Sequence, residues 1–273
     1  IDLEASAGAV TGSGALIANG ITLNAGGAGG INVSGTFTPL STGGTVLLLS
    51  GAGLTIGGQI GRSNAPYNIV TTLNGSSPGV AGDIAVDASI YAATIALYAQ
   101  SGHTLTVGST ATFQSPSSGS SSVSLTAPQL LLPVGNNLTL NGYRSVTFAS
   151  PTGVPSFRLS GAVTLTGGGA QVLNLPNNLS FAGNTQLTAP TIQFTNSAID
   201  LLTYTVSLIG NILVPQDTTF SSTGGNGTLG LQGSLTGTGT LTVSPSVLVT
   251  LPSASLTLAA DKIVLNNALT GSS

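Results

Sequence analysis

Residues 82–107 read Gly-Asp-Ile-Ala-Val-Asp-Ala-Ser-Ile-Tyr-Ala-Ala-Thr-Ile-Ala-Leu-Tyr-Ala-Gln-Ser-Gly-His-Thr-Leu-Thr-Val and contain three short alternating triplets. The triplets are Ile84-Ala-Val86, Ile95-Ala-Leu97 and Leu105-Thr-Val107. In each, two apolar residues flank a small or polar one, and a period of two residues is typical of a strand with one buried side. The segment therefore predicts three short strands joined by turns.

Triplets of this kind recur through most of the chain. The others are Ile21–Leu23, Ile31–Val33, Leu54–Ile56, Val123–Leu125, Leu138–Leu140, Val146–Phe148, Phe157–Leu159, Val163–Leu165, Leu179–Phe181, Ile192–Phe194, Val206–Leu208, Leu241–Val243, Leu256–Leu258 and Ile263–Leu265. Strands this short, bounded by single turns, are typical of a parallel β-helix, in which each strand pairs with its equivalent one coil away. We expect an all-β solenoid with Leu, Ile, Val and Phe inside.

One or two triplets per coil predict a repeat of roughly 18–24 residues, within the range of solenoid repeats. The 39 Gly and 13 Pro, with abundant Ser and Thr, argue against long helices. Two segments break the rhythm, 62–81 and 115–122, and we expect both to be loops extruded from the coil. Neither is long enough for a domain linker, so residues 1–273 are predicted to form one domain.

The composition restricts the partners. Only 4% of the residues are charged, and the formal net charge is -3. Four cations cannot neutralise a run of phosphates or hold an anionic membrane, so nucleic acid is excluded as a partner. No apolar run approaches the ~18 residues that a membrane span needs, so we expect no membrane insertion. Cys, Met and Trp are absent, which excludes disulfides and thiolate metal sites and suits an extracellular location.

Residues 82–107, together with Ala254–Leu265, resemble the degenerate repeats of filamentous haemagglutinin-type exoproteins, the adhesins of bacterial two-partner secretion. The resemblance implies a right-handed parallel β-helix, an extracellular or cell-surface location, and a role in adhesion or surface structure. The Asn-Pro-Asn motif of that family's secretion module has no counterpart here, because the chain contains no Asn-Pro pair. The resemblance therefore implies a repeat shaft without its export signal.

Some parallel β-helices are polysaccharide lyases or hydrolases, whose chemistry needs clustered carboxylates, often with a Lys or Arg. The one arrangement that the spacing permits here is Arg62, Asp83 and His103, 21 and 20 residues apart, with Asp87 close to Asp83. We interpret these four as turn residues that cap backbone groups or face solvent. The chain has one His, which excludes a multi-His metal site. We predict no catalytic, cofactor-binding or metal-binding residues.

Two further motifs are considered and set aside. Gly224-Gly-Asn-Gly-Thr-Leu229 begins like a calcium-binding nonapeptide, but Leu229 occupies the position of the Asp ligand. The same segment matches the dinucleotide-binding pattern G-x-G-x-x-G, but no helix is expected after it.

Thr-x-Thr pairs could form an ice-binding face if they lay at the same place on each coil. Their spacing is irregular, so outward-facing strand Thr is the better interpretation. The pairs are Thr104 and Thr106, Thr164 and Thr166, Thr203 and Thr205, and a run across Thr236–Thr242.

The sequence thus predicts a non-enzymatic, structural or adhesive extracellular solenoid, part of a bacterial surface fibre, filament or adhesin. A carbohydrate-active β-helix enzyme is the alternative, and an ice-binding solenoid a minor one. We expect copies of the chain or adjoining repeats to stack end to end, because the alternation starts at Ile1-Asp-Leu3 with few protecting charges. The charges near the ends are Asp2, Glu4, Asp261 and Lys262. Cell-surface or carbohydrate receptors are further expected partners, and no cofactor is expected.

Overall fold

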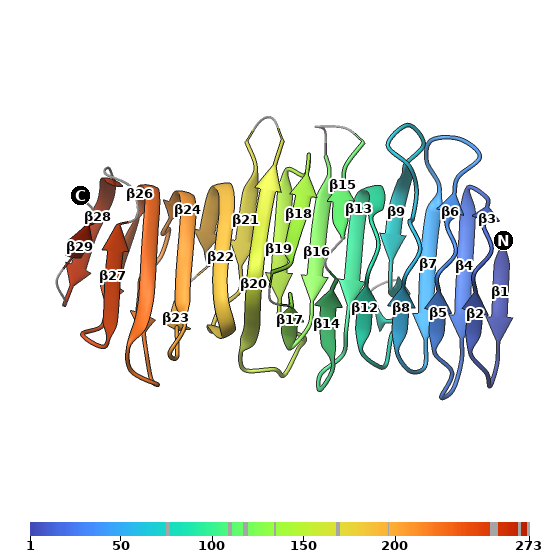
Figure 1. Ribbon diagram of the computed structural model, residues 1–273, viewed down its shortest axis with the longest axis horizontal. Coiled ribbons are helices and arrows are strands. Elements are labelled where there is room, and N and C mark those ends of the chain that lie inside the picture. Colours follow the sequence, from blue (N-terminus) through green and yellow to red (C-terminus); the bar gives the residue numbers. More distant parts are fainter. Residues whose placement is uncertain are drawn as a thin grey trace.

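The computed structural model describes residues 1–74, 77–108, 111–116, 120–133, 135–167, 170–195, 197–251, 256–266 and 269–271. These residues form an all-β, parallel β-solenoid of about 23 residues per coil, and no helix occurs among them. The coils follow one another along the long axis of an elongated stack, with the N- and C-termini at opposite ends (Figure 1). The predicted fold class and coil length are confirmed.

Parallel pairing between coils arranges the strands in three stacks, which we number one to three in the order in which the chain visits them. Stack one contains β1 (Asp2–Ala5), β4 (Gly20–Ala25), β7 (Thr45–Ser50), β9 (Tyr67–Thr71), most of β13 (Ile90–Tyr98), β16 (Ser122–Thr126), β19 (Ser145–Ala149) and β21 (Val172–Leu175). Stack two contains β2 (Val10–Gly12), β5 (Ile31–Val33), β8 (Leu54–Ile56), β12 (Ile84–Val86), β14 (Thr104–Val107), β17 (Gln129–Leu131), β23 (Ser197–Asp200) and β25 (Thr218–Ser221). Stack three contains β3 (Leu16–Ile17), β6 (Phe37–Thr38), β15 (Thr112–Gln114), β18 (Asn137–Asn141), β27 (Val247–Leu251) and β29 (Leu269–Gly271).

Longer strands turn the corners between stacks. They are β20 (Phe157–Thr166), β22 (Leu179–Phe194), β24 (Thr205–Leu213), β26 (Gly227–Val243) and β28 (Leu256–Leu265). In β24, for example, Thr205–Ile209 belongs to stack three and Asn211–Leu213 to stack one, with Gly210 between them. Gly210 has φ +136, and a Cβ there would lie 1.8 Å from the carbonyl oxygen of Ala189, so the corner requires glycine. The sequence analysis, which expected only short strands, missed this continuity.

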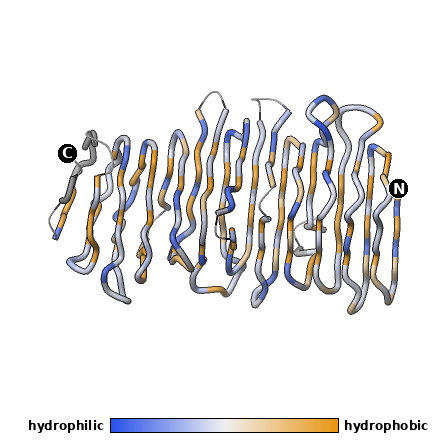
Figure 2. Tube along the Cα trace, viewed as in Figure 1, coloured by the Kyte–Doolittle hydropathy of each residue, from blue (hydrophilic) through white to orange (hydrophobic). Residues whose placement is uncertain are grey.

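The core consists of apolar ladders that run the length of the stack. One ladder in stack one is formed by Ile21, Val46, Val70, Ile95, Val123, Val146, Leu173, Ile192, Ile212 and Leu235, each in register with the next. All ten are at most 1% exposed. Along each strand, apolar residues alternate with more polar ones, as the hydropathy colouring shows (Figure 2). Burying one apolar side chain of this size contributes roughly 1.5–3 kcal/mol, so the ladders hold coils whose strands could not be stable alone.

All 17 triplets lie within strands. Their apolar ends are buried wherever the structure describes the side chains, except that Ile263 and Leu265 are only partly buried. The expectation of a loop over 62–81 was wrong in part. This segment contains strand β9 and a small antiparallel hairpin, β10 (Leu73–Asn74) with β11 (Ser77–Pro78). Strand β9 escaped notice because Asn68 and Ile69 are both exposed between buried Tyr67 and Val70, which breaks the alternation. In the second predicted loop, 117–119 lie outside the described residues.

Candidate functional site

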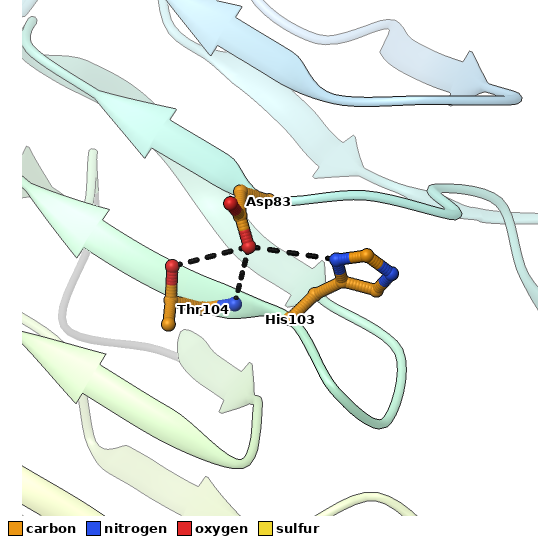
Figure 3. A network of polar contacts seen from close by, with 3 residues as sticks. All are labelled: Asp83, His103 and Thr104. Carbon is orange, nitrogen blue, oxygen red and sulfur yellow. Dashed lines mark hydrogen bonds and ion pairs between the residues drawn. The ribbon is translucent and has the colours of Figure 1, made fainter. Parts of the chain in front are cut away.

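The spacing of Asp83 and His103 allows them to align on neighbouring coils, and the structure places them together. Asp83 precedes β12, and β12 pairs with β14 so that Ile84 faces Leu105. Oδ1 of Asp83 accepts hydrogen bonds from the backbone N–H of Thr104 at 2.7 Å and from its hydroxyl at 3.2 Å. Nδ1 of His103 lies 3.5 Å from the same oxygen (Figure 3).

The Asp83–His103 pair is open to solvent. The side chain of Asp83 is 68% exposed and that of His103 37%. A surface ion pair of this kind contributes about 1 kcal/mol or less. Since one carboxylate oxygen already binds the backbone of the next coil, the geometry is that of a cap on a strand start.

Arg62 does not join this pair, so the alignment of Arg62 with Asp83 that the spacing permitted does not occur. Ile60 pairs with Ile90 and Leu54 with Ile84, so this coil is 30 residues long instead of 21. The hairpin β10–β11 accounts for the extra length. Arg62 instead lies in a turn, where it exchanges backbone hydrogen bonds with Ala65 at 3.0 and 3.1 Å.

Asp87 lies at the other end of β12 from Asp83. Four residues of extended chain separate their Cα atoms by about 13 Å, and the carboxylates contact different parts of the next coil, Thr104 for Asp83 and Gly108 for Asp87. The Oδ1 of Asp87 packs over the backbone of Gly108, where an added Cβ would lie 2.1 Å from it. Among the residues that the structure describes, no cluster of three or more His, Cys, Asp or Glu could hold a metal ion.

The bond between Asp83 and Thr104 recurs along the stack. Other side chains accept a hydrogen bond from a backbone N–H about one coil later in the same way: Asp200 from Thr223 at 3.0 Å, Asp217 from Thr240 at 2.8 Å, Asn184 from Thr205 at 2.9 Å and Asn19 from Ser41 at 3.0 Å. We call these the coil clamps. Their sequence signal is an Asp or Asn followed 21–23 residues later by Thr or Ser, which the sequence analysis did not identify.

Asp200 forms the most extensive coil clamp. Its Oδ1 accepts from the N–H groups of Leu202 and Thr223, both at 3.0 Å, and its Oδ2 accepts from the Thr223 hydroxyl at 2.6 Å. Partial burial raises the pKa of this carboxyl, but the hydrogen bonds from Thr223 and Leu202 outweigh it and hold the pKa below its ordinary value. The charge of Asp200 therefore stabilises contacts between coils.

The Gly224–Leu229 motif is not a ligand loop. Gly225 and Asn226 have φ of +71 and +63, which forms a turn, and β26 starts at Gly227. Leu229, at the position of the missing Asp, is fully buried. No helix follows, which confirms that the glycine spacing reflects a turn and a strand.

The Thr pairs of the sequence analysis lie in different stacks. Thr104 and Thr106 belong to stack two, Thr164 and Thr166 to stack three, and Thr236–Thr242 crosses from stack one to stack two. A register column does exist in stack three, where Thr112, Thr139, Thr164 and Thr188 follow one another. This column of threonines is only one residue wide. The next outward-facing column beside it consists of Gln114, Asn141 and Thr166, so it does not add a second row of threonines.

Two tyrosines stabilise the interior. The hydroxyl of Tyr67 donates to the carbonyl of Ala18 and that of Tyr143 to the carbonyl of Ala92, each at 2.9 Å and about 50 residues back along the chain. Both side chains are 0% exposed. Burial raises the pKa of Tyr67 to about 12 and that of Tyr143 further. Neither ring is available to stack on a ligand.

An open groove of about 820 Å³ lies at the corner between stacks two and three. Its lining comes from the ends of β14 and β17, the corners of β20 and β22, and the starts of β18 and β24. No Asp, Glu, Lys, Arg or aromatic residue is part of the described lining. Residues from five coils converge in this groove, so no local pattern in the sequence indicates it.

No protein family, curated protein or solved structure matches this chain significantly. The resemblance to haemagglutinin-type repeats therefore rests on the sequence of residues 82–107 and Ala254–Leu265 alone. The structure establishes the β-solenoid fold and no family. Within the described ranges, no helix is long and apolar enough to cross a membrane.

Proposed function

We propose that this chain is a non-enzymatic, structural or adhesive segment of an extracellular bacterial fibre, filament or adhesin. The observation that carries the proposal is the use of the carboxylates: Asp83, Asp200 and Asp217 each accept a backbone N–H from the next coil. A hydrolase or lyase instead needs carboxylates grouped around a substrate. The scarcity of charge and the absence of Cys and Met support an extracellular location.

The first coil supports end-to-end stacking. Ile1 and Leu3 are 46% and 42% exposed, whereas their counterparts one coil on, Ile21 and Leu23, are 1% and 0% exposed. Leu3 also lines a cavity of about 160 Å³, whose other lining residues include the core residue Leu23. A further parallel coil, from adjoining repeats or from a second copy, would bury these side chains and pair the free edge of β1. Of the predicted end charges, the side chains of Asp261 and Lys262 lie outside the described residues.

Electron microscopy and light scattering at micromolar concentration test the assembly. We expect rods or fibres longer than one chain, and Leu3→Asp should shorten them because it places a charge in the apolar end of the stack. Leu40→Asp is the matched control, since Leu40 is 73% exposed in the loop after β6 on the second coil and is not part of the apolar core. A monodisperse monomer, unchanged by Leu3→Asp, would contradict end-to-end assembly.

The absence of catalysis is tested by incubating the chain with polygalacturonate and with neutral glucans. We expect no release of reducing ends or unsaturated products. Turnover that disappears in Asp83→Ala, but persists when the equivalent coil clamp is removed in Asp217→Ala, would establish the enzymatic alternative. The location is tested by adding protease to intact source bacteria, where loss of the protein without lysis is the expected result.

A further inference from the structure

The groove between stacks two and three is shaped for a linear ligand. Its outward side chains form a register column, Asn137, Ala162, Gln186 and Ser207, with one residue from each of four successive coils. Since neighbouring coils are about 4.8 Å apart, the column presents groups over roughly 15 Å. On the side of stack two the lining contains Thr106, Leu131 and Ser160 in register, and Pro133. Polar groups thus recur along the fibre axis beside apolar ones.

Small residues keep the corner of the groove open. Gly161 has φ +91, and a Cβ there would lie 2.4 Å from the Cβ of Leu132. Ala162, Ala182 and Gly183 continue the lining on the next parts of the corner. A larger side chain at Ala162 would stand in the column between Asn137 and Gln186.

Asn184 is a fixed hydrogen-bond donor in this groove. Its Oδ1 accepts the backbone N–H of Thr205, so the amide orientation is determined: the oxygen must face Thr205 and Nδ2 is the donor. No hydrogen bond among the described residues uses that Nδ2. Asp83, Asp200 and Asp217 make the same coil clamp with a carboxylate. In the groove, Asn performs the clamp without adding charge and leaves an N–H donor for a ligand.

The lining excludes several ligand classes. A charged polymer would lose hydration without gaining an ionic partner, because the described lining has no charged side chain. Nucleic acid would lack both cations and aromatic stacking. An extended peptide could not add a strand, since the backbones of β17, β20 and β22 are already paired with one another. Amide and hydroxyl groups beside apolar surface remain, and these suit a neutral polymer rich in hydroxyl groups.

We propose that this groove binds an uncharged oligosaccharide, extended along the fibre axis, with Asn184 donating a hydrogen bond to a sugar oxygen. This inference rests on the adhesive part of the proposed function and names the class of receptor. It requires no catalysis.

The test is binding to a microarray of neutral, acidic and sulfated oligosaccharides and extended peptides, followed by calorimetry with the strongest ligand. We expect neutral oligosaccharides to bind, and longer chains to bind better until they span the column. Asn184→Asp keeps the acceptor for Thr205 but replaces the donor with a negative charge, so affinity should fall about tenfold or more. Asp217→Asn makes the mirror-image change in a coil clamp outside the groove and should leave affinity unchanged.

Ala162→Trp provides a second, steric test, because the indole would fill the middle of the column and abolish binding. Ala96→Trp is its control, since Ala96 is a half-buried outward residue in stack one, between Thr71 and Ser124. Circular dichroism confirms that each variant keeps its strands. The inference is wrong if no neutral glycan binds, if acidic glycans or peptides bind more tightly, or if Asn184→Asp and Ala162→Trp both retain affinity. Rods that assemble normally but bind no glycan would overturn this inference alone and leave the structural role intact.

Discussion

The hydroxyl of Thr223 donates to Oδ2 of Asp200 across 2.6 Å, although the two residues are 23 positions apart in the chain. The Thr223 N–H binds Oδ1 of the same carboxylate. One side chain thereby fixes the register between two coils at the end of β23. Because a backbone N–H of the following coil also donates to Asp83, Asp217 and Asn184, the coil clamps are a general stabilising device of this stack.

Removing the Asp200 clamp should destabilise the stack. Asp200→Ala leaves two N–H groups and one hydroxyl without their acceptor, and we expect a loss of about 1–2 kcal/mol in the free energy of unfolding. Asp200→Asn retains an acceptor and should cost less. Urea denaturation followed by circular dichroism measures both. Equal stability of Asp200→Ala and wild type would show that water replaces these bonds without cost.

The Asp200 clamp should also make stability depend on acid pH. The folded-state pKa of Asp200 lies below its ordinary value of 3.8, so its contribution is present above that pH and is lost as the pH falls through the folded value. The urea midpoint of wild type should therefore fall more steeply than that of Asp200→Asn between pH 5 and about pH 3. Parallel curves for the two proteins would contradict this assignment.

Tyr143→Phe should destabilise the chain by about 1–3 kcal/mol, because it leaves the buried carbonyl of Ala92 without its donor. Tyr67→Phe should act in the same direction through Ala18. Tyr98→Phe is the control, since Tyr98 is half-buried and no hydrogen bond of its hydroxyl occurs among the described residues. The urea midpoint of Tyr98→Phe should match that of wild type. If Tyr98→Phe lost as much stability as Tyr143→Phe, the loss could not be attributed to the hydrogen bond with Ala92.

At alkaline pH the hydroxyls of Tyr67 and Tyr143 should lose their protons at a higher pH than an ordinary tyrosine does. Burial raises the pKa of Tyr67 to about 12 and that of Tyr143 further, so the fold favours the protonated phenol. Their stabilisation is complete below the ordinary value of 10.0 and is lost as the pH rises through the folded values. Phenolate absorbance should show a late step that coincides with loss of the strand signal and is missing from the double variant Tyr67→Phe/Tyr143→Phe.

Corner glycines should be more sensitive than turn glycines. Gly210→Ala combines φ +136 with a Cβ 1.8 Å from the carbonyl oxygen of Ala189, so we expect a loss of at least about 3 kcal/mol or failure to fold. Gly102→Ala has φ +87 but no atom within 4 Å of its Cβ, and should cost about 1 kcal/mol. Thermal unfolding of both variants checks the order, and a reversed order would show that backbone conformation outweighs steric contact.

The strands could be predicted from sequence because alternation is local. In Leu105-Thr-Val107 and Val123-Ser-Leu125 the apolar ends are buried and the middle residue is not, as a period of two requires. Strand β9 could not be predicted in this way, because Asn68 and Ile69 interrupt its alternation. It is a strand because neighbouring coils on both sides supply its hydrogen-bond partners.

The candidate site was predictable only where the coil length was regular. Asp83 and His103 met as expected across a 21-residue coil, whereas a 30-residue coil carried Arg62 away from Asp83. A hairpin of a few residues is enough to change which turn residues lie next to each other on neighbouring coils. The coil clamps and the buried tyrosines join residues about 20 to 50 positions apart, and the groove is lined by residues from Thr106 to Ser207. None of them was identified from the sequence.

The sequence by itself determined that this chain forms a stack of short parallel strands with an aliphatic core, because alternation and turn residues act within a few positions. The tertiary structure decided which residues lie next to one another between coils, because coil lengths vary, from 19 residues between Leu173 and Ile192 to 30 between Leu54 and Ile84. Each insertion shifts the register of the surface while the buried ladder stays aligned. The core therefore follows from local pattern, whereas Asn184 and its groove exist only once the coils are stacked.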